Sequence, residues 1–396
     1  MSEPLAAQHP APRSTPLRAR HESLGASFTD FGGWMMPVRY SSDLAEHHAV
    51  RTAAGLFDIS HMAEFLVTGA AAVGFLDYAL AGRISTMRVG KAKYSLVLAD
   101  DGGIVDDVIV YRIADERFLV IANAGNRDAV AAALAERAGR APVAAAFADG
   151  PFEGVFGLAA ATDAARIEDV SDELSLIAVQ GPLARRVLEA TAGISDASPA
   201  LEDLGYYAWS SASFDGVPLF VARTGYTGED GFELLVPNDA AGPLWDAVLA
   251  AGQPLGLVPA GLAARDTLRL EAGMPLYGHE LGRDVRPAQA GLGRAVAADK
   301  DDFVGKAGVT PPPGAPVLVG LVAEGRRAGR AGYAVTDADG TRVGEVTSGA
   351  LSPTLGHPIA MAFLSPSALD APVFIDVRGT AIPATITALP FYRRNS

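Results

Sequence analysis

The sequence predicts an α+β protein with a long mixed N-terminal region and a β-rich C-terminal domain. Three observations support this class. Segments with helical periodicity alternate with β-branched runs as far as residue 273. A proline-rich break, TPPPGAP, occupies residues 310–316. Beyond this break the chain contains only short strand-like runs separated by turns, which is typical of a separate all-β domain.

Composition limits the possible classes of function. The 396 residues suffice for two or three domains, and 49% hydrophobic residues allow a large core. The net charge of −14 argues against nucleic acid as the main partner. No apolar run approaches about 18 residues, so we expect no membrane partner. The absence of cysteine excludes disulfides, thiolate metal sites and cysteine nucleophiles, and it fits a cytoplasmic location.

The first third of the chain yields these elements in order. Residues 1–14 are rich in Pro and Ala, lack the apolar core of a signal peptide and are expected to form a flexible tail. Residues 41–55 are predicted to be a helix that stops at Gly55, and residues 56–69 a strand. A helix over 70–80, three strands within 92–123 and a helix over 127–139 follow.

The rest of the chain is predicted in the same way. Residues 140–165 have little pattern, and residues 175–193 indicate a strand, a turn and a helix. Residues 217–237 favour a strand pair around a Gly-rich turn, followed by helices over 242–252 and 260–273. The expected domains are 15–309, as two interleaved α+β domains, and 310–396, whose strands lie within 317–325, 332–349, 358–364 and 373–386.

Two adjacent carboxylates stand inside an apolar run, GGIVDDVIVYR, at residues 102–112. Ionised carboxylates in a buried strand are costly unless something pairs with them or uses them. Alternation places Asp106 with Ile104 and Val108, and Asp107 with Val105 and Ile109. The pattern by itself does not show which carboxylate faces a site.

Other segments carry polar residues in unusual places. ARTGYTGEDGFELL sets Tyr226 on a glycine-rich turn and Glu233 inside an apolar strand. GLAARDTLRLEAG sets Arg265 and Arg269 on one helix face. His61 lies in an apolar strand, and a hydrogen-bonded core histidine is its favoured interpretation over a chemical role. His47 and His48 are adjacent and point apart on a helix, so we expect no metal site there.

Taken together, these segments resemble the glycine cleavage T-protein, or aminomethyltransferase, family. The resemblance runs from about residue 15 to residue 394 and rests on an ordered set of motifs. The set comprises DFGGWMMPVRY, RTAAGLFDISHM, GKAKYSL, GGIVDDVIVYR, IANAGN, VQGP, GYTGEDGFE, GLAARDTLRLEAGMPLYGHEL and TSGALSPTLG. The resemblance implies three domains arranged as a ring, with a C-terminal barrel domain and a central tetrahydrofolate site. It also implies a lipoylated H-protein as the partner that delivers an aminomethyl group, with release of ammonia.

The resemblance also implies the site residues. Asp107 matches the catalytic aspartate, which leaves Asp106 a structural role. The expected folate contacts are Met62, Tyr94, Asn123, Tyr226, Glu233, Arg265 and Tyr392. A fixed carboxylate suits proton transfer at the folate nitrogens, and a buried glutamate accepts two parallel hydrogen bonds from a pterin edge. Ordinary alternatives are Met62 as core, Tyr94 as a strand aromatic and Arg265 as an exposed partner of Asp266 or Glu271.

Some features leave alternatives open. Ala63 and Arg294 depart from the family pattern, and Arg326, Arg327 and Arg330 form a basic cluster that faces the carrier or is a solvated turn. One alternative function is another tetrahydrofolate-dependent demethylase, acting on a sulfonium or methylamine substrate. The oxidase-linked relatives fit less well, because the chain has no nucleotide-binding half. A non-catalytic folate-binding protein is a further alternative, although those relatives centre on a cysteine motif.

Overall fold

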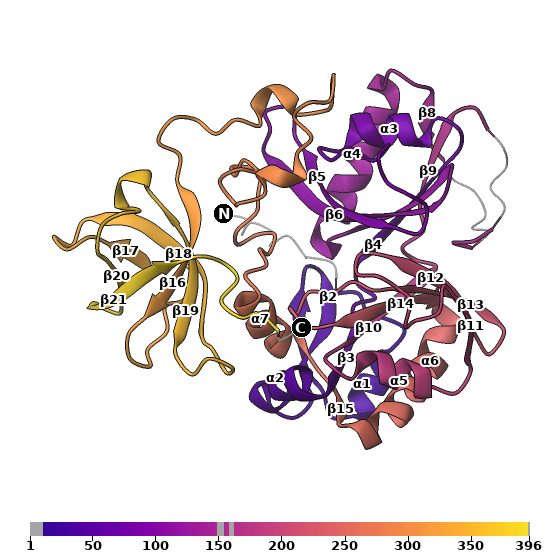
Figure 1. Ribbon diagram of the computed structural model, residues 1–396, viewed down its shortest axis with the longest axis horizontal. Coiled ribbons are helices and arrows are strands. Elements are labelled where there is room, and N and C mark those ends of the chain that lie inside the picture. Colours follow the sequence, from indigo (N-terminus) through magenta and orange to yellow (C-terminus); the bar gives the residue numbers. More distant parts are fainter. Residues whose placement is uncertain (1–10, 149–153, 158–161, 395–396) are drawn as a thin grey trace, which may run out of the picture.

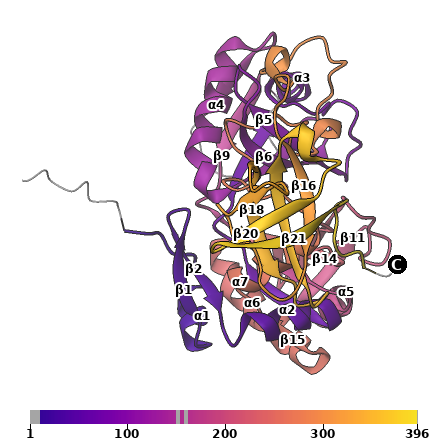
Figure 2. The same cartoon turned by 90° about the vertical axis from the view of Figure 1, so that its left-hand side faces the viewer.

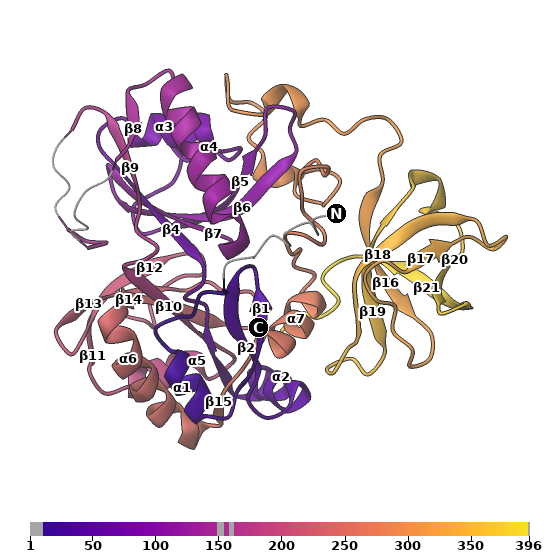
Figure 3. The same cartoon turned by 180° about the vertical axis from the view of Figure 1, so that it is seen from behind.

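The computed structural model describes residues 11–148, 154–157 and 162–394. Two α+β units and a barrel lie around a common centre, as Figure 1 shows from the front and Figure 3 from behind. Residues 1–10 of the predicted tail lie outside the described residues. Arg13 is already paired, because its N–H donates to Gly33 O at 2.8 Å and its carbonyl accepts from Met35 N at 2.7 Å. The chain is therefore anchored from Arg13 onward.

The N-terminal segment forms a helix and a separate hairpin. The helix is α1 (Arg18–Ser23), and the hairpin joins β1 (Ser27–Phe31) to β2 (Trp34–Arg39) as a sheet of its own. Gly32 and Gly33 form the turn with positive φ values of 60° and 84°, a conformation that other residues adopt only at a cost. Figure 2 shows this hairpin at one edge of the molecule.

The first unit is built on a six-stranded sheet. Its order is β5 (Ala92–Leu98), β6 (Ile104–Ala114), β7 (Arg117–Ala122), β4 (Ala63–Thr68), β9 (Ala165–Asp169) and β8 (Ala145–Phe147). The three strands predicted within 92–123 are confirmed as an antiparallel meander. Helices α3 (Ala72–Ala79) and α4 (Arg127–Arg140) cover one face, where Phe65, Phe75 and Leu134 are buried. The other face of the sheet packs against the second unit.

The second unit is built on a seven-stranded sheet. Its order is β11 (Ile194–Ser198), β12 (Trp209–Phe214), β13 (Val217–Ala222), β14 (Gly231–Pro237), β10 (Leu174–Gln180), β3 (Ala54–Asp58) and β15 (Leu257–Pro259). The predicted strand pair over 217–237 is confirmed as β13 and β14. Helices α5 (Ala184–Ala190) and α6 (Asn238–Gly252) pack on one face around the fully buried Trp245.

The prediction for residues 41–69 was partly wrong. The helix is α2 (Asp43–Thr52), and Gly55 lies inside β3 rather than ending the helix. Residues 56–69 form no single strand, because β3 and β4 belong to different sheets. Both strands are buried along their whole length, so their apolar runs lack the alternation that would have separated them. The short link between them carries His61 and Met62.

The inner faces of the two sheets share one hydrophobic cluster. Tyr111 and Leu119 come from the first sheet, and Leu176, Phe220 and Leu235 come from the second. Helix α7 (Leu262–Glu271) contributes to the same cluster and also contacts β18 and β19 of the barrel. The site described below lies beside this cluster, where both sheets, α7 and the hairpin meet.

The C-terminal domain is a closed six-stranded barrel, as expected. Its order is β16 (Val317–Ala323), β19 (Pro358–Leu364), β18 (Arg342–Leu351), β17 (Ala334–Thr336), β20 (Val373–Val377) and β21 (Thr380–Thr387). The described residues also contain short turns of 3-10 helix: η1 (Ala124–Asn126), η2 (Gln253–Leu255), η3 (Gly293–Ala295), η4 (Lys306–Gly308) and η5 (Pro366–Ala368). The boundary predicted at residue 310 falls between η4 and β16. Within the described part of the chain, no helix is long and apolar enough to cross a membrane.

Candidate active site

A cavity of about 220 Å³ lies where the two sheets meet. Its wall contains all but one of the residues that the sequence assigned to catalysis and folate binding: Met62, Tyr94, Asp107, Asn123, Tyr226, Glu233 and Arg265. Further polar or aromatic residues in the wall are Phe31, His61, Tyr111 and Tyr207. Residues more than 200 positions apart in the sequence are thus collected around one space.

Strand β6 sends the two aspartates to opposite faces of its sheet. Val108 and Val110 pack in the core under α3 and α4, and Asp106 shares their side of the strand. Asp107 points the other way, toward the second sheet, where it lines the cavity between the two sheets. The position of the helices on one face of the sheet therefore determines which of the two carboxylates reaches the cavity. The alternation of the strand did not determine this.

Asp106 is fully buried and is held entirely by asparagines. It accepts hydrogen bonds from Asn123 N at 2.9 Å, Asn123 Nδ2 at 2.8 Å and Asn126 Nδ2 at 2.7 Å. Burial, followed by repulsion from Asp107, raises the pKa of Asp106 to about 7 in spite of these bonds. These contacts agree with the structural role expected for Asp106.

Asp107 is partly exposed to the cavity and has one donor on each oxygen. Tyr94 OH donates to Oδ2 at 3.1 Å, and Asn123 Nδ2 donates to Oδ1 at 2.8 Å. Burial raises the pKa of Asp107, while the hydrogen bonds from Tyr94 and Asn123 oppose the shift. A carboxyl group with a raised pKa, fixed in a cavity wall, is suited to exchange a proton with a ligand.

Glu233 presents one free oxygen to the cavity. Its Oε2 accepts from Thr224 Oγ1 at 2.5 Å and from Tyr111 OH at 3.4 Å. Among the described residues no hydrogen-bond donor is found for Oε1. Burial raises the pKa of Glu233, while Thr224 and the charge of Arg265 oppose the shift. Thr224 and Tyr111 therefore orient the carboxylate through Oε2, and Oε1 is left to accept a hydrogen bond from a ligand.

Arg265 is a half-buried cation with no ion pair among the described residues. Its guanidinium carbon lies 4.9 Å from the centre of the Tyr226 ring, and Nη1 is buried with no hydrogen-bond partner in the described part of the chain. The alternative that Arg265 pairs with Asp266 or Glu271 is wrong, because those carboxylates bind Arg269 and Arg51. Burial lowers the pKa of Arg265, and Glu233 opposes the shift. A hydrogen-bond acceptor on a ligand would remove the free-energy cost of burying Nη1 without a partner.

Tyr392 does not join the other predicted contacts at the cavity wall. Its ring lies under the guanidinium of Arg51, 4.1 Å from Arg51 Cζ, and its N–H donates to Glu271 O at 2.8 Å. Ala63 is buried under the helix layer, and Arg294 lies in η3. Neither of these two departures from the family pattern lines the cavity, although Ala63 directly follows the wall residue Met62.

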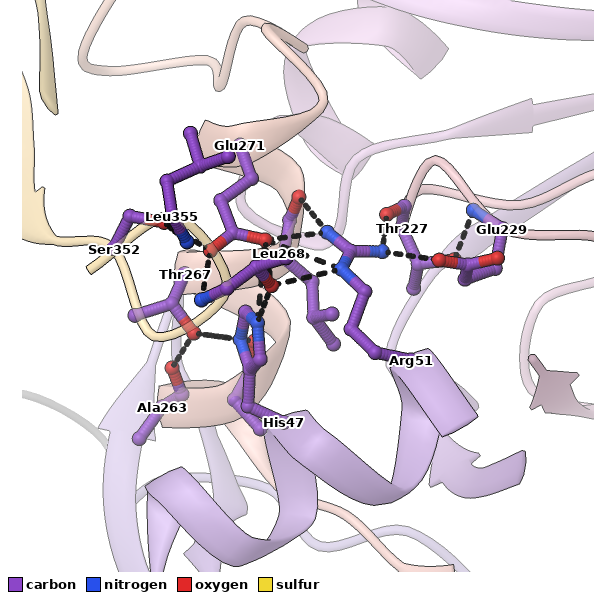
Figure 4. A network of polar contacts seen from close by, with 12 residues as sticks. His47, Arg51, Thr227, Glu229, Ala263, Thr267, Leu268, Glu271, Ser352 and Leu355 are labelled. Carbon is purple, nitrogen blue, oxygen red and sulfur yellow. Dashed lines mark hydrogen bonds and ion pairs between the residues drawn. The ribbon is translucent and has the colours of Figure 1, made fainter. Parts of the chain in front are cut away.

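A buried polar network fixes the elements that carry the cavity residues (Figure 4). Arg51 of α2 donates to Thr227 O at 2.7 Å and to Glu229 Oε1 at 3.0 Å, and both residues lie within three positions of Tyr226 on the glycine-rich turn. The same guanidinium donates to Glu271 Oε2 at 2.8 Å, at the end of α7. Arg51 therefore ties the turn that bears Tyr226 to the helix that bears Arg265.

The network also binds the barrel to this helix. Ser352 Oγ and Thr354 N, which follow β18, donate to Glu271 Oε1 at 2.5 and 3.0 Å. His47 places Nδ1 2.8 Å from Thr267 Oγ1 and Nε2 2.9 Å from Thr354 Oγ1 (Figure 4). His47 is thus used structurally. Among the described residues, no group of three or more His, Asp or Glu is arranged to hold a metal ion.

Several wall residues were missed by the sequence analysis. Tyr111 could have been found, because residues 107, 109 and 111 share one face of β6. The sequence carried no comparable signal for Phe31, which comes from the separate hairpin, or for Tyr207, which comes from a loop. His61 lines the cavity and has no hydrogen bond within the described part of the chain, so its favoured interpretation as a hydrogen-bonded core histidine was wrong.

Comparisons with known proteins agree with this architecture. Residues 17–300 match the GCVT N-terminal domain, and residues 317–393 match the glycine cleavage T-protein C-terminal barrel domain. An aminomethyltransferase of Cutibacterium acnes is 51% identical over 391 residues, covering 97% of this chain and 99% of that protein. One of Streptomyces avermitilis is 51% identical over 397 residues, covering 97% and 98%.

A solved structure gives the same result. The crystal structure of the glycine cleavage system aminomethyltransferase T from Bartonella henselae superposes with a TM-score of 0.82 at 35% identity. The match covers 96% of this chain and 98% of that one. The chain therefore belongs to the glycine cleavage T-protein family of aminomethyltransferases, and it is an enzyme of the transferase class.

Proposed function

We propose that the cavity binds tetrahydrofolate and that the enzyme transfers a one-carbon unit to it from an aminomethyl-lipoyl H-protein. In this reaction the carbon loses its bonds to the lipoyl sulfur and to the amino nitrogen, and it gains bonds to two folate nitrogens. One hydrogen from the folate nitrogens leaves in ammonia, and the other leaves on the dihydrolipoyl thiol. The products are ammonia, 5,10-methylenetetrahydrofolate and the dihydrolipoyl carrier.

The polar groups of the cavity that lack protein partners support a folate-like ligand. Among the described residues, Glu233 Oε1 has no hydrogen-bond donor and Arg265 Nη1 is buried without an acceptor. A pterin ring carries adjacent N–H donors and an oxo acceptor on its edge, so it satisfies both groups at once. Tyr94, Tyr226 and Met62 supply flat or polarisable walls for the ring.

The observation that carries the proposal is that Asp107 and Asp106 lie on opposite faces of strand β6, with Asp107 on the face toward the cavity. Asp107 is the member of the pair that reaches the cavity, and Tyr94 and Asn123 fix both of its oxygens. Asp107 would hold a proton on one folate nitrogen, accept one from the other and stabilise positive charge on the transferred carbon. Folate, when bound, supplies the nitrogens that receive the carbon.

The test is an ammonia-release assay with aminomethylated H-protein, with and without tetrahydrofolate. We expect ammonia release to depend on tetrahydrofolate and 5,10-methylenetetrahydrofolate to form in equal amount. A protein that releases no ammonia from this carrier, yet demethylates a small sulfonium or methylamine in the presence of tetrahydrofolate, would contradict the proposal. A protein that binds folate but turns over neither donor would be a folate-binding protein only.

A further inference from the structure

We infer that His61 is an additional ligand-binding residue of the cavity, donating a hydrogen bond from Nε2 to an acceptor atom of the pterin ring. This inference rests on the proposed function. It adds to the predicted folate contacts a residue from the link between β3 and β4, directly before Met62.

Three histidines are buried in the described part of the chain, and His61 differs from the other two. His21 has Asp58 at one ring nitrogen and Tyr40 at the other, at 2.8 and 2.9 Å. His47 has a threonine at each nitrogen. His61 is 4% exposed and has no hydrogen bond within the described residues at either nitrogen, although it lines the cavity. Both ring nitrogens of His21 and of His47 therefore have a hydrogen-bond partner, whereas those of His61 have none among the described residues.

The surroundings of His61 determine its charge and its tautomer. Burial lowers the pKa of His61 to about 4, with Asp58 opposing and Arg265 adding to the shift, so the ring is neutral near pH 7. Nδ1 is buried and has no hydrogen-bond partner in the described part of the chain. Buried N–H groups without an acceptor are rarer in proteins than acceptors without a donor, so we assign the proton to Nε2. Nε2–H is then the donor available to the cavity.

The position of the ring favours the pterin end of the ligand. His61 packs edge-on against Phe31 with ring centres 5.6 Å apart, which fixes its plane. It is close enough to Arg265 for the guanidinium to lower its pKa, and Arg265 is a proposed pterin contact. A neutral donor beside a cation suits a second acceptor on the same ring, because both groups donate to the ligand without repelling each other.

The experiment compares two ligands and three variants by anaerobic calorimetry. The ligands are tetrahydrofolate and 6-methyltetrahydropterin, which has the pterin ring without the aminobenzoyl-glutamate tail. His61→Phe keeps a ring against Phe31 but removes the N–H, whereas His61→Gln places an amide N–H near the position of Nε2. His48→Phe makes the same replacement at an exposed histidine of α2 and serves as the control.

We expect His61→Phe to raise Kd about tenfold for both ligands, the loss of one hydrogen bond to a buried donor. His61→Gln should stay within about threefold of the wild type, and His48→Phe should bind as the wild type does. Melting temperatures check that each variant is folded.

Three results would overturn the inference. They are an unchanged affinity of folded His61→Phe, a loss confined to tetrahydrofolate, which would place the contact on the tail, or a loss in His61→Gln as large as in His61→Phe. A wild-type protein that binds neither ligand would instead reject the proposed function, and this inference with it.

Discussion

The side-chain nitrogen of Asn123 lies 2.8 Å from Oδ1 of Asp107, and both residues line the cavity. The same nitrogen lies 2.8 Å from Oδ1 of Asp106 on the other side of strand β6. One amide therefore bridges two carboxylates that point to opposite faces of a sheet. Because Asn123 directly follows β7, the neighbouring strand, the pairing of β6 with β7 sets the orientation of Asp107.

We expect Asp107→Asn to lose turnover by at least about 100-fold, the scale of general acid–base catalysis. The amide keeps the size of the carboxylate but cannot accept and return a proton. Folate affinity should stay close to that of the wild type, since Glu233 and Arg265, the groups proposed to bind the pterin edge, are unchanged. Ammonia release measures the first effect and calorimetry the second.

Asp106→Asn is the matched control, because it makes the same change one residue earlier. It should lower stability by disturbing the contacts with Asn123 and Asn126, with a smaller effect on turnover. If Asp106→Asn abolished turnover while Asp107→Asn kept it, the wrong carboxylate would have been assigned.

Glu233→Gln should weaken tetrahydrofolate binding by about 1.5–3 kcal/mol, the scale for hydrogen bonds to a charged group. Gln has one carbonyl oxygen where Glu has two equivalent acceptors, and it removes the negative charge facing Arg265. Calorimetry on the protein without ligand measures the change. Glu168→Gln, on β9 and outside the cavity wall, is the control. Unaltered affinity in folded Glu233→Gln would mean that the pterin is held by other groups.

Glu271 should make stability depend on pH. Burial would raise its pKa, but the interaction with His47, whose Nε2 also lies 3.2 Å from Glu271 Oε2, and the hydrogen bonds from Ser352 and Arg51 outweigh burial. They lower the pKa to about 2, against 4.5 for the unperturbed group. A lowered folded-state pKa stabilises the protein above pH 4.5, and this contribution is lost as pH falls from 4.5 to 2. The shift corresponds to about 3 kcal/mol.

The measurement is urea unfolding of the wild type and Glu271→Gln at pH 6, 4.5 and 3. The advantage of the wild type should be largest at pH 6 and should shrink as the pH is lowered. Glu189→Gln, which disturbs only the exposed pair of Glu189 with Arg185, should show almost no difference at any pH. A constant gap between the wild type and Glu271→Gln would show that the network stabilises by packing instead of by charge.

The basic cluster on the barrel offers a test of carrier docking. Arg326 and Arg327 are exposed, and Arg330 donates to Gly349 O at 3.3 Å, so only the first two are changed. The net charge of −14 would repel an acidic carrier, and a local basic patch offsets this. Arg326→Glu with Arg327→Glu should raise the apparent KM for H-protein and flatten its salt dependence, while folate affinity stays unchanged.

The control for docking is the matched double change at Arg185 and Arg186 on α5, which alters the net charge equally. Rates are measured against H-protein concentration at two ionic strengths. Equal behaviour of the two double variants would mean that total charge, and no local patch on the barrel, governs the encounter.

The sequence by itself determined most elements and the candidate residues. Periodicity defined the meander around Asp107, the strand pair around Tyr226 and the helix that bears Arg265, because these features depend on residues a few positions apart. The ordered motifs predicted the family, and the barrel followed the proline-rich break. Local pattern failed at residues 56–69, where two fully buried strands carry no alternation to separate them.

Only the tertiary structure decided which polar groups meet and which are already satisfied. Asp106 and Asp107 are equivalent in a strand pattern, and packing of α3 and α4 on one face of the sheet distinguishes them. The ring of Tyr392 contacts Arg51, and Arg269 pairs with Glu280. His61 and Arg265 each have a buried nitrogen with no hydrogen-bond partner among the described residues. Hydrogen-bond satisfaction depends on neighbours that are distant in sequence, so no local pattern contains it.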